Sequence, residues 1–259
     1  MKAREFISRL EEDYPLEYAL EWDNVGLLLG NREKEIRKIY IALDVTKEVL
    51  RAAIASGADM VLTHHPLMMK PIRRITGGCF LTRAIMELLQ QDMLCYAMHT
   101  NYDVLRMGKL ASAMLGLEDA KPLDCGECRE ENLGIGEIGT LAEPITLQNC
   151  AKLVKDTFAL NDIKIFGDVN QQVQRIAVVP GSGKSTIRSA VAKGAEVLIT
   201  GDIGHHDALD ALEENLMIID AGHYGTEHIF LADMKAYVNE HFAKIQVETH
   251  PITQPFCTI

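Results

Sequence analysis

The sequence contains an internal repeat, and this repeat limits the possible folds more than any other feature. The segment IYIALDVTKEVLRAAIASGADMVLTHH, which starts at Ile39, aligns without a gap with IAVVPGSGKSTIRSAVAKGAEVLITGD, which starts at Ile176. The identical pairs include Lys47/Lys184, Arg51/Arg188, Ala53/Ala190, Ala55/Ala192, Gly57/Gly194, Ala58/Ala195 and Thr63/Thr200. Further along, MLCYAMHTNYD from Met93 parallels MIIDAGHYGTEH from Met217. A repeat of this kind indicates two copies of one structural unit.

Within each copy, short apolar runs alternate with segments of helical periodicity. In the first half we predict helices at 2–12, 47–56, 81–90 and 109–115, and strands at 39–43, 60–63 and 93–98. In the second half, strands at 197–200 and 217–220 follow the strand that begins at Ile176. This alternation is typical of an α/β fold with a largely parallel sheet. We therefore predict two related α/β lobes, residues 1–124 and 125–259, with a C-terminal helix that could pack back on the first lobe.

The composition argues against two classes of partner. The formal net charge of −11 disfavours a general affinity for nucleic acid, because phosphate contacts need a surplus of Lys and Arg. The longest apolar stretches are the size of strands, too short to span a membrane. The N-terminal stretch MKAREFISRLEEDYP is charged and has no signal-peptide core, so we expect a cytoplasmic protein.

Two motifs look functional but favour a structural interpretation. A phosphate-binding loop that ends at Gly183 needs a glycine five positions earlier, and that position is Val178. The stretch VVPGSGKST is therefore predicted to be a turn between a strand and a helix. Cys125 and Cys128 form a lone C-x-x-C pair in the polar stretch DCGECREEN, which favours a surface loop over a zinc or redox site.

Histidines and carboxylates gather where the predicted strands end. The clusters are His64 with His65, His99 with Asp103, His205 with His206 and Asp207, and His223 with Glu227 and His228. In α/β sheets, ligands bind beyond the carboxyl ends of the strands. Two related halves that face each other would bring these strand ends around one cleft. The sequence therefore predicts a metal site in a cleft between the lobes.

The side chains in these clusters suit divalent transition metals. Imidazoles and carboxylates together favour zinc, iron, manganese or cobalt, whereas calcium prefers oxygen alone. Because neighbouring side chains of an extended strand diverge, we expect His64 and His65 to address different ions of a pair. Glu227 could bridge the two ions and Asp103 could complete a shell, which leaves positions for water.

Five motifs carry a resemblance to a known family. They are EWDNVGLLLG at 21–30, LTHHPLM at 62–68, HTNYD at 99–103, GDIGHHDALDA at 201–211 and DAGHYGTEH at 220–228. Together they resemble the GTP cyclohydrolase I type 2 homologue family, whose members are also described as Nif-three-like. The resemblance implies two α/β lobes with a dinuclear metal centre between them, and a ring-shaped homohexamer. As metal ligands it implies His64, His65, Asp103, His223 and Glu227.

The resemblance also implies a reaction, the opening of the GTP imidazole ring with release of formate. On this hypothesis the substrate is a small molecule such as GTP or another nucleotide, and His99 or His206 moves a proton. Two alternatives stay open: a metal-dependent phosphoester or nucleotide hydrolase, and a metal-binding scaffold without enzymatic activity. For His205 and His206, a supporting contact, a substrate contact and a solvated loop also stay open.

Overall fold

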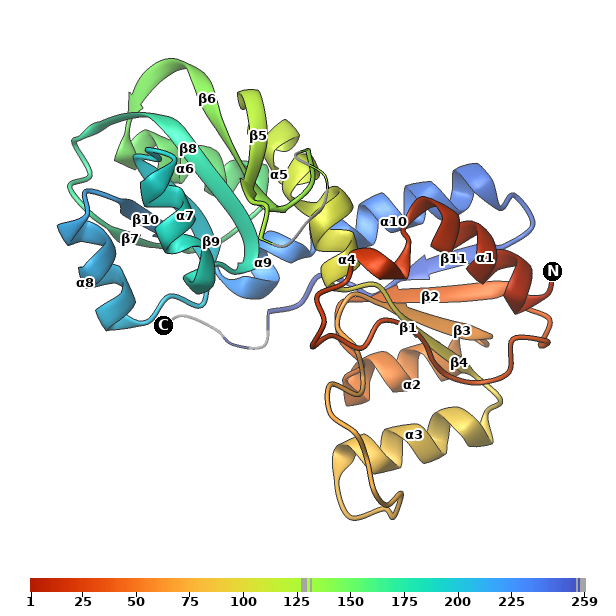
Figure 1. The fold of residues 1–259 in the computed structure, drawn as a ribbon. Coiled ribbons are helices and arrows are strands. Elements are labelled where there is room, and N and C mark those ends of the chain that lie inside the picture. The colour runs from red at the N-terminus through yellow and green to blue at the C-terminus, as the bar shows by residue number, and fades with distance from the viewer. Residues whose placement is uncertain (127–129, 131, 255, 257–259) are drawn as a thin grey trace. The chain divides into compact units, whose positions relative to one another are not determined.

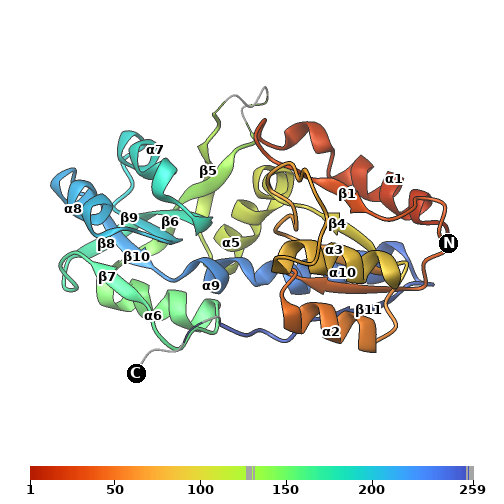
Figure 2. The ribbon, with the colours of Figure 1, turned by 90° about the horizontal axis from the view of Figure 1, so that it is seen from below.

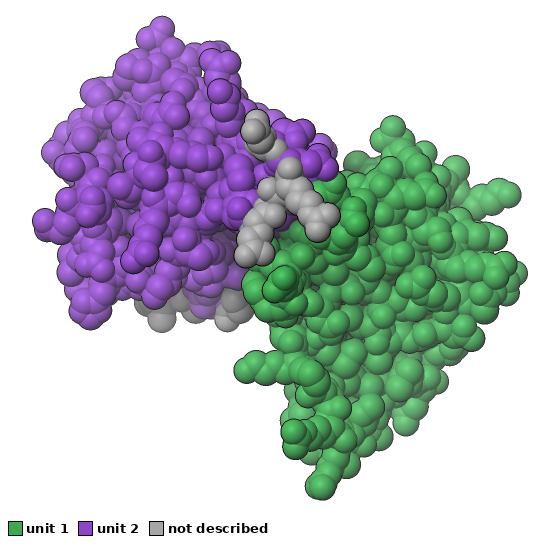
Figure 3. Space-filling view, in the orientation of Figure 1, with its two compact units in different colours: residues 1–102, 230–252 green, residues 103–229, 253–259 purple. Residues whose placement is uncertain are grey.

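The computed structural model describes residues 1–126, 130, 132–254 and 256, so that Cys128 of the C-x-x-C pair lies outside the described residues. The chain divides into two compact units (Figure 3). Unit 1 comprises residues 1–102 and 230–252, and unit 2 comprises residues 103–229 and 253–259. Each unit contains one β-sheet and several helices, which confirms the predicted α/β class. The lobe boundary at residue 124 stays a prediction.

Unit 1 is built on a five-stranded sheet with the strand order β1-β4-β3-β2-β11. The strands are β1 (Gly26–Leu29), β2 (Lys38–Ala42), β3 (Met60–Thr63), β4 (Leu94–Ala97) and β11 (Gln246–Thr249). Strands β4, β3, β2 and β11 run parallel, and β1 at the edge is antiparallel to β4. The largely parallel sheet that the sequence predicts is therefore present in this unit.

Helices cover both faces of this sheet. Helices α1 (Ala3–Asp13) and α10 (Ile229–His241) lie on one face, and α2 (Lys47–Ala55) and α3 (Phe80–Gln90) on the other (Figure 1). Helix α1 buries Phe6, Ile7 and Leu10, the apolar face that its periodicity predicts. Two short helical segments, η1 (Leu16–Tyr18) and α4 (Thr100–Tyr102), complete the unit. With both faces covered, the strand ends are the places where polar side chains can meet a ligand.

Unit 2 has a six-stranded sheet with the order β5-β6-β8-β9-β10-β7. The strands are β5 (Glu118–Asp124), β6 (Ile135–Thr146), β7 (Lys164–Phe166), β8 (Gln172–Ser182), β9 (Val197–Gly201) and β10 (Met217–Asp220). Strands β8, β9 and β10 are parallel, whereas β5, β6 and β7 make antiparallel pairs. This sheet is more mixed than predicted, because β5 is a polar and mostly exposed edge strand that shows no apolar run.

Helices α7 (Ile187–Ala192) and α8 (His205–Glu213) cover one face of this sheet, and α6 (Leu147–Thr157) covers the other (Figure 2). The remaining helical segments are η2 (Asp103–Met107), α5 (Gly108–Met114), η3 (Lys184–Thr186) and α9 (His223–Glu227). Segment η2 is a turn of π-helix that continues directly into α5. Across the part of the chain that the structure describes, every helix is too short or too polar to span a bilayer.

The sheet registers confirm the internal repeat. In unit 1, Ile39 of β2 lies opposite Met60 of β3, and in unit 2 the aligned residues Ile176 of β8 and Val197 of β9 lie opposite each other. The third strands also correspond, because β4 follows β3 and β10 follows β9 in the same parallel order. Each third strand has an antiparallel neighbour, β1 or β7, on its outer side. The two units therefore share one βαβαβ core with different additions.

Candidate metal centre

The first group of candidate ligands lies at the strand ends of unit 1. His64 and His65 follow β3, and His99 follows β4. Each offers one ring nitrogen, and these three atoms all lie within 4.8 Å of one another. The ring centroids of His64 and His65 are 4.9 Å apart, so these neighbours converge. The expected divergence is absent because both residues come after the last residue of the strand, where the alternation of side chains no longer holds.

Hydrogen bonds at Nδ1 fix how His64 and His65 present their rings. The Nδ1 atom of His64 lies 2.8 Å from the main-chain oxygen of Met98, and a carbonyl can only accept, so Nδ1 carries the proton. The Nδ1 atom of His65 lies 2.9 Å from Oδ1 of Asp44. In both rings Nε2 then carries the lone pair, which is the tautomer that binds metal ions.

His99 is held by a buried carboxylate. Its Nδ1 atom lies 2.9 Å from Oδ1 of Asp23, whose other oxygen accepts hydrogen bonds from the main-chain N–H and the hydroxyl of Thr100. Burial by itself would raise the pKa of Asp23, but the hydrogen bonds from His99 and Thr100 outweigh it and lower that pKa to about 2. The carboxylate is therefore ionised at neutral pH and keeps a proton on Nδ1 of His99.

Asp23 and Asp44 were not among the predicted site residues. Asp23 belongs to the EWDNVG motif, which carried the resemblance but no stated role, and the neighbouring Trp22 places its ring edge-on to His99 at 5.9 Å. Asp44 follows β2, and it was not predicted because no histidine lies beside it in the sequence at that strand end. A search for carboxylates at every strand end, including those without histidines, would have found Asp44.

The second group of candidate ligands lies in unit 2 on helix α9. His223 and Glu227 are four residues apart, so they face the same side of the helix. Nε2 of His223 lies 3.0 Å from Oε2 of Glu227, close enough for both atoms to bind one ion. The Nδ1 atom of His223 lies 2.7 Å from Oδ2 of Asp202. Thus the Nδ1 atom of the candidate histidine in this unit also contacts a carboxylate, and Asp202 is a further candidate that was not predicted.

The glycine-rich stretch VVPGSGKST serves the position of Glu227. Gly181 has a φ of +76°, and a Cβ atom at this position would lie 2.1 Å from Oε1 of Glu227. The N–H of Gly181 donates to the hydroxyl of Thr226 at 2.9 Å. Lys184 forms an ion pair with Asp207 at 3.0 Å. The stretch leaves β8, which ends at Ser182, and leads through η3 into α7, so it connects a strand to a helix as predicted, and glycine is needed at position 181 for the close approach of a side chain.

The other predicted residues lie in different surroundings. Asp103 begins the π-helical segment η2, a type of segment that is frequent at functional sites. His205 and His206 are exposed on the first turn of α8. His228 is buried, and its Nε2 lies 2.8 Å from the main-chain oxygen of Phe158, which indicates a structural role. The roles assigned to Asp103 and His206 stay predictions.

The fold and these two groups define a class: proteins with two related α/β units that carry oriented histidines and carboxylates at their strand ends. Within that class, residues 1–255 match the family model described as Duf34/NIF3 (NGG1p interacting factor 3). The chain belongs to this family.

Relatives named "GTP cyclohydrolase 1 type 2 homolog" cover most of the chain. The one from Clostridium perfringens is 35% identical over 242 residues, which are 93% of this chain and 92% of the relative. The one from Streptococcus pneumoniae is 34% identical and covers 93% of this chain and 91% of its own length.

Solved structures show the same fold. The crystal structure of Staphylococcus aureus hypothetical protein SA1388 has a TM-score of 0.90 at 28% identity and covers 100% of this chain and 99% of its own. Reduced HcgD from Methanocaldococcus jannaschii has a TM-score of 0.83 at 30% identity and covers 96% of this chain and 97% of its own.

Proposed function

We propose that the protein is a hydrolase that depends on two divalent metal ions. The proposed ligands are His64, His65, Asp103, His223 and Glu227. The observation that carries the proposal is the arrangement at Nδ1, where each of the three histidines has a carbonyl or carboxylate oxygen within 2.9 Å. Such partners orient metal-binding imidazoles and raise their basicity. The mixture of imidazole and carboxylate suits zinc, iron, manganese or cobalt.

Divalent ions at this set of residues would supply Lewis-acid activation of water and of the substrate. The residues of the chain supply proton transfer and positioning. His99 is the first candidate for proton transfer, because the ionised Asp23 holds its Nδ1 and its ring lies beside the proposed ligands His64 and His65. His206 is the second candidate, and its exposure on α8 leaves it accessible to a small substrate.

The candidate reaction is the opening of the imidazole ring of GTP with release of formate. The names of the relatives support GTP as the first substrate to test. We further propose that the protein acts in the cytoplasm on a small nucleotide and assembles as a homohexamer. Light scattering of the purified protein tests the assembly: a mass of six chains of 28.8 kDa is expected, and a monomer contradicts it.

Elemental analysis tests the metal proposal before any substrate is assumed. We expect about two divalent ions per chain in the wild type and a clear loss of bound metal in His65→Ala. The control is His205→Ala, which removes an exposed histidine outside the proposed ligands and should keep both ions. Equal metal content in all three proteins would contradict the proposal.

Incubation of the metal-loaded protein with GTP then tests the reaction. Formate release that is lost in His65→Ala supports ring opening. Release of orthophosphate or a monophosphate supports the phosphoester alternative instead. If neither product forms while metal binding is intact, the scaffold alternative is favoured. Equal formate from the wild type and His65→Ala would contradict ring opening at this site.

A further inference from the structure

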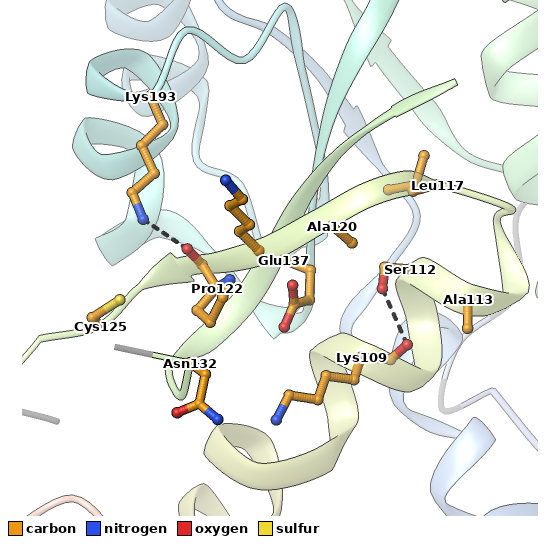
Figure 4. Close-up of a pocket in the computed structure, with 11 residues that line it drawn as sticks. Lys109, Ser112, Ala113, Leu117, Ala120, Pro122, Cys125, Asn132, Glu137 and Lys193 are labelled. Atoms are coloured by element: carbon orange, nitrogen blue, oxygen red, sulfur yellow. Dashed lines mark hydrogen bonds between the residues drawn. The ribbon is translucent and has the colours of Figure 1, made fainter. Parts of the chain in front are cut away.

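Unit 2 contains a cavity of about 800 Å³ whose lining includes none of the proposed metal ligands. It lies along strands β5 and β6 and is closed on one side by helix α5 (Figure 4). Its volume falls in the range of small-molecule sites in proteins. The charged groups of its lining are Lys109, Lys121, Lys193 and Glu137. In a chain with a net charge of −11, three ammonium groups around one carboxylate are a local exception.

Glu137 is the most informative of these groups. It is the third residue of β6, opposite Pro122 of β5 and Val178 of β8, and only 4% of its surface is exposed. Among the described residues, none donates a hydrogen bond to its carboxylate and none forms an ion pair with it. Burial raises the pKa of Glu137, and the ammonium groups of Lys109 and Lys193 oppose this shift. Because Glu137 lines the cavity, its carboxylate is available to accept hydrogen bonds from a ligand there.

Two glycines bring Lys109 and Glu137 to the same cavity. A Cβ atom on Gly108 would lie 2.9 Å from the Cα atom of Gly136, so the backbones of α5 and β6 touch. Gly136 has a φ of +69°, a conformation that residues with a side chain rarely adopt. Lys109 follows Gly108 and Glu137 follows Gly136, and both side chains extend into the cavity (Figure 4).

The lysines lie at different places around the carboxylate. Lys193, at the end of α7, donates from Nζ to the main-chain oxygen of Pro122 at 2.7 Å, which holds its ammonium group at the β5 side. Lys109 reaches the cavity from α5. A ligand that matches these groups has an anionic end for the ammonium groups and N–H donors for the buried carboxylate.

We propose that this cavity binds a guanine nucleotide, with the guanine edge at Glu137 and the phosphate at Lys109. Guanine presents a ring N–H beside an amino group, a pair of donors that one carboxylate can accept. The phosphate pairs with the ammonium group of Lys109, and the cavity is large enough for a mononucleotide. None of the proposed metal ligands lines the cavity, so its binding of a nucleotide can be tested on metal-depleted protein.

Calorimetric titration of metal-depleted full-length protein with GMP tests this site. We expect GMP to bind, and IMP, which lacks the amino group, to bind more weakly. Glu137→Gln should weaken GMP binding at least about tenfold, because the amide nitrogen opposes the donors of guanine. Lys109→Ala should weaken GMP and IMP alike, since both carry the same phosphate. The matched control Lys152→Ala changes an exposed lysine on α6 and should leave both affinities unchanged.

Several outcomes would overturn the proposal. The first is that the wild type does not bind GMP. The second is that Glu137→Gln and Lys109→Ala bind GMP with affinities within about twofold of the wild type, and the third is that GMP and inorganic phosphate bind equally well. Thermal unfolding of the ligand-free proteins guards against a folding defect. Glu137→Gln should unfold at the same or a higher temperature than the wild type, because it removes a buried charge. Metal content should be unchanged in both variants, which separates this test from that of the metal centre.

Discussion

The two units place different residues at equivalent strand ends. The gapless repeat aligns Asp44 of unit 1 with Gly181 of unit 2, and His65 with Asp202. In unit 1, Asp44 follows β2, the first strand of the shared core, and orients His65, which follows the second core strand, β3. In unit 2, Asp202 follows the second core strand, β9, and orients His223, which follows the third core strand, β10. The same βαβαβ core can therefore support an oriented imidazole in two ways. In unit 2 both the acid and the histidine lie one core strand later than their counterparts in unit 1.

The glycines of unit 2 are the counterpart of side chains in unit 1. His64 aligns with Gly201, where a Cβ atom would lie 2.3 Å from the main-chain nitrogen of His223. Gly181 similarly makes room for Glu227. Unit 2 thus brings His223 and Glu227 close to the sheet by omitting side chains, whereas unit 1 has a candidate ligand, His64, and an orienting carboxylate, Asp44, at those positions. Substitutions in both units test this contrast, from the largest expected effect to the smallest.

Gly181→Ala should be the most damaging change. The new Cβ atom would meet Glu227 at 2.1 Å in a backbone with φ of +76°, so we expect a loss of about 3 kcal/mol in the free energy of unfolding and a loss of bound metal. Denaturant unfolding and elemental analysis measure both. The matched control is Gly194→Ala, where φ is +71° but no atom lies within 4 Å; it should lose only about 1 kcal/mol and keep its metal. Equal effects of the two changes would refute the contrast.

Asp44→Asn and Asp202→Asn should weaken metal binding by similar amounts. Each removes the carboxylate charge behind one histidine, and such partners typically contribute about 10- to 100-fold in metal affinity. Competition with a chelator measures the affinities. Asp207→Asn is the control, since its carboxylate pairs with Lys184 and not with a histidine. A loss in only one of the two variants would show that the units do not use their carboxylates equivalently.

Asp23→Asn should remove a pH dependence that belongs to unit 1. The folded pKa of Asp23, about 2, lies below its ordinary value of 3.8, so its contribution to stability is present above pH 4 and is lost as the pH falls through 2. The contribution is about 2 kcal/mol. Unfolding titrations between pH 2 and 7 should show the difference between wild type and variant shrinking as the pH falls. A difference that is constant over this range would mean that the carboxylate is not stabilised as described.

Thr46→Ala should have the smallest effect. The hydroxyl of Thr46 accepts a hydrogen bond from the N–H of Val49 at 3.2 Å and caps helix α2, so we expect a loss of about 1 kcal/mol. The aligned residue of unit 2 is Gly183, where a Cβ atom would lie 2.2 Å from the hydroxyl of Thr200, so this unit cannot carry the same cap. Thr46→Ser keeps the hydroxyl and should retain most of the stability in thermal unfolding. Equal losses in both variants would exclude the cap as the cause.

Local patterns were enough for the parts of the fold that are periodic. The apolar runs at 39–43 and 60–63 predicted β2 and β3, and the apolar face of 2–12 predicted α1. Strand β6 was missed because its glycines and proline conceal the alternation that would mark a strand. The alignment of Met93 with Met217 was wrong by one residue. The N–H of Met98 donates to the main-chain oxygen of Thr63, and the N–H of Ala221 donates to that of the aligned Thr200, so Met98 is the structural equivalent of Ala221. The register depends on which residues of neighbouring strands pair, and the apolar runs of these two strands did not resolve a difference of one residue.

The order of residues alone determined the repeat, the α/β class and the choice of histidines and carboxylates at strand ends, because these depend on periodicity and on residue chemistry. Tertiary structure decided which carboxylate contacts the Nδ1 atom of which histidine, as for Asp44 with His65 and Asp202 with His223. The position of Glu137 in a cavity likewise depends on the tertiary contact between Gly108 and Gly136, which brings α5 against β6. Contacts between residues far apart in the chain depend on packing, and packing is a property of the whole fold.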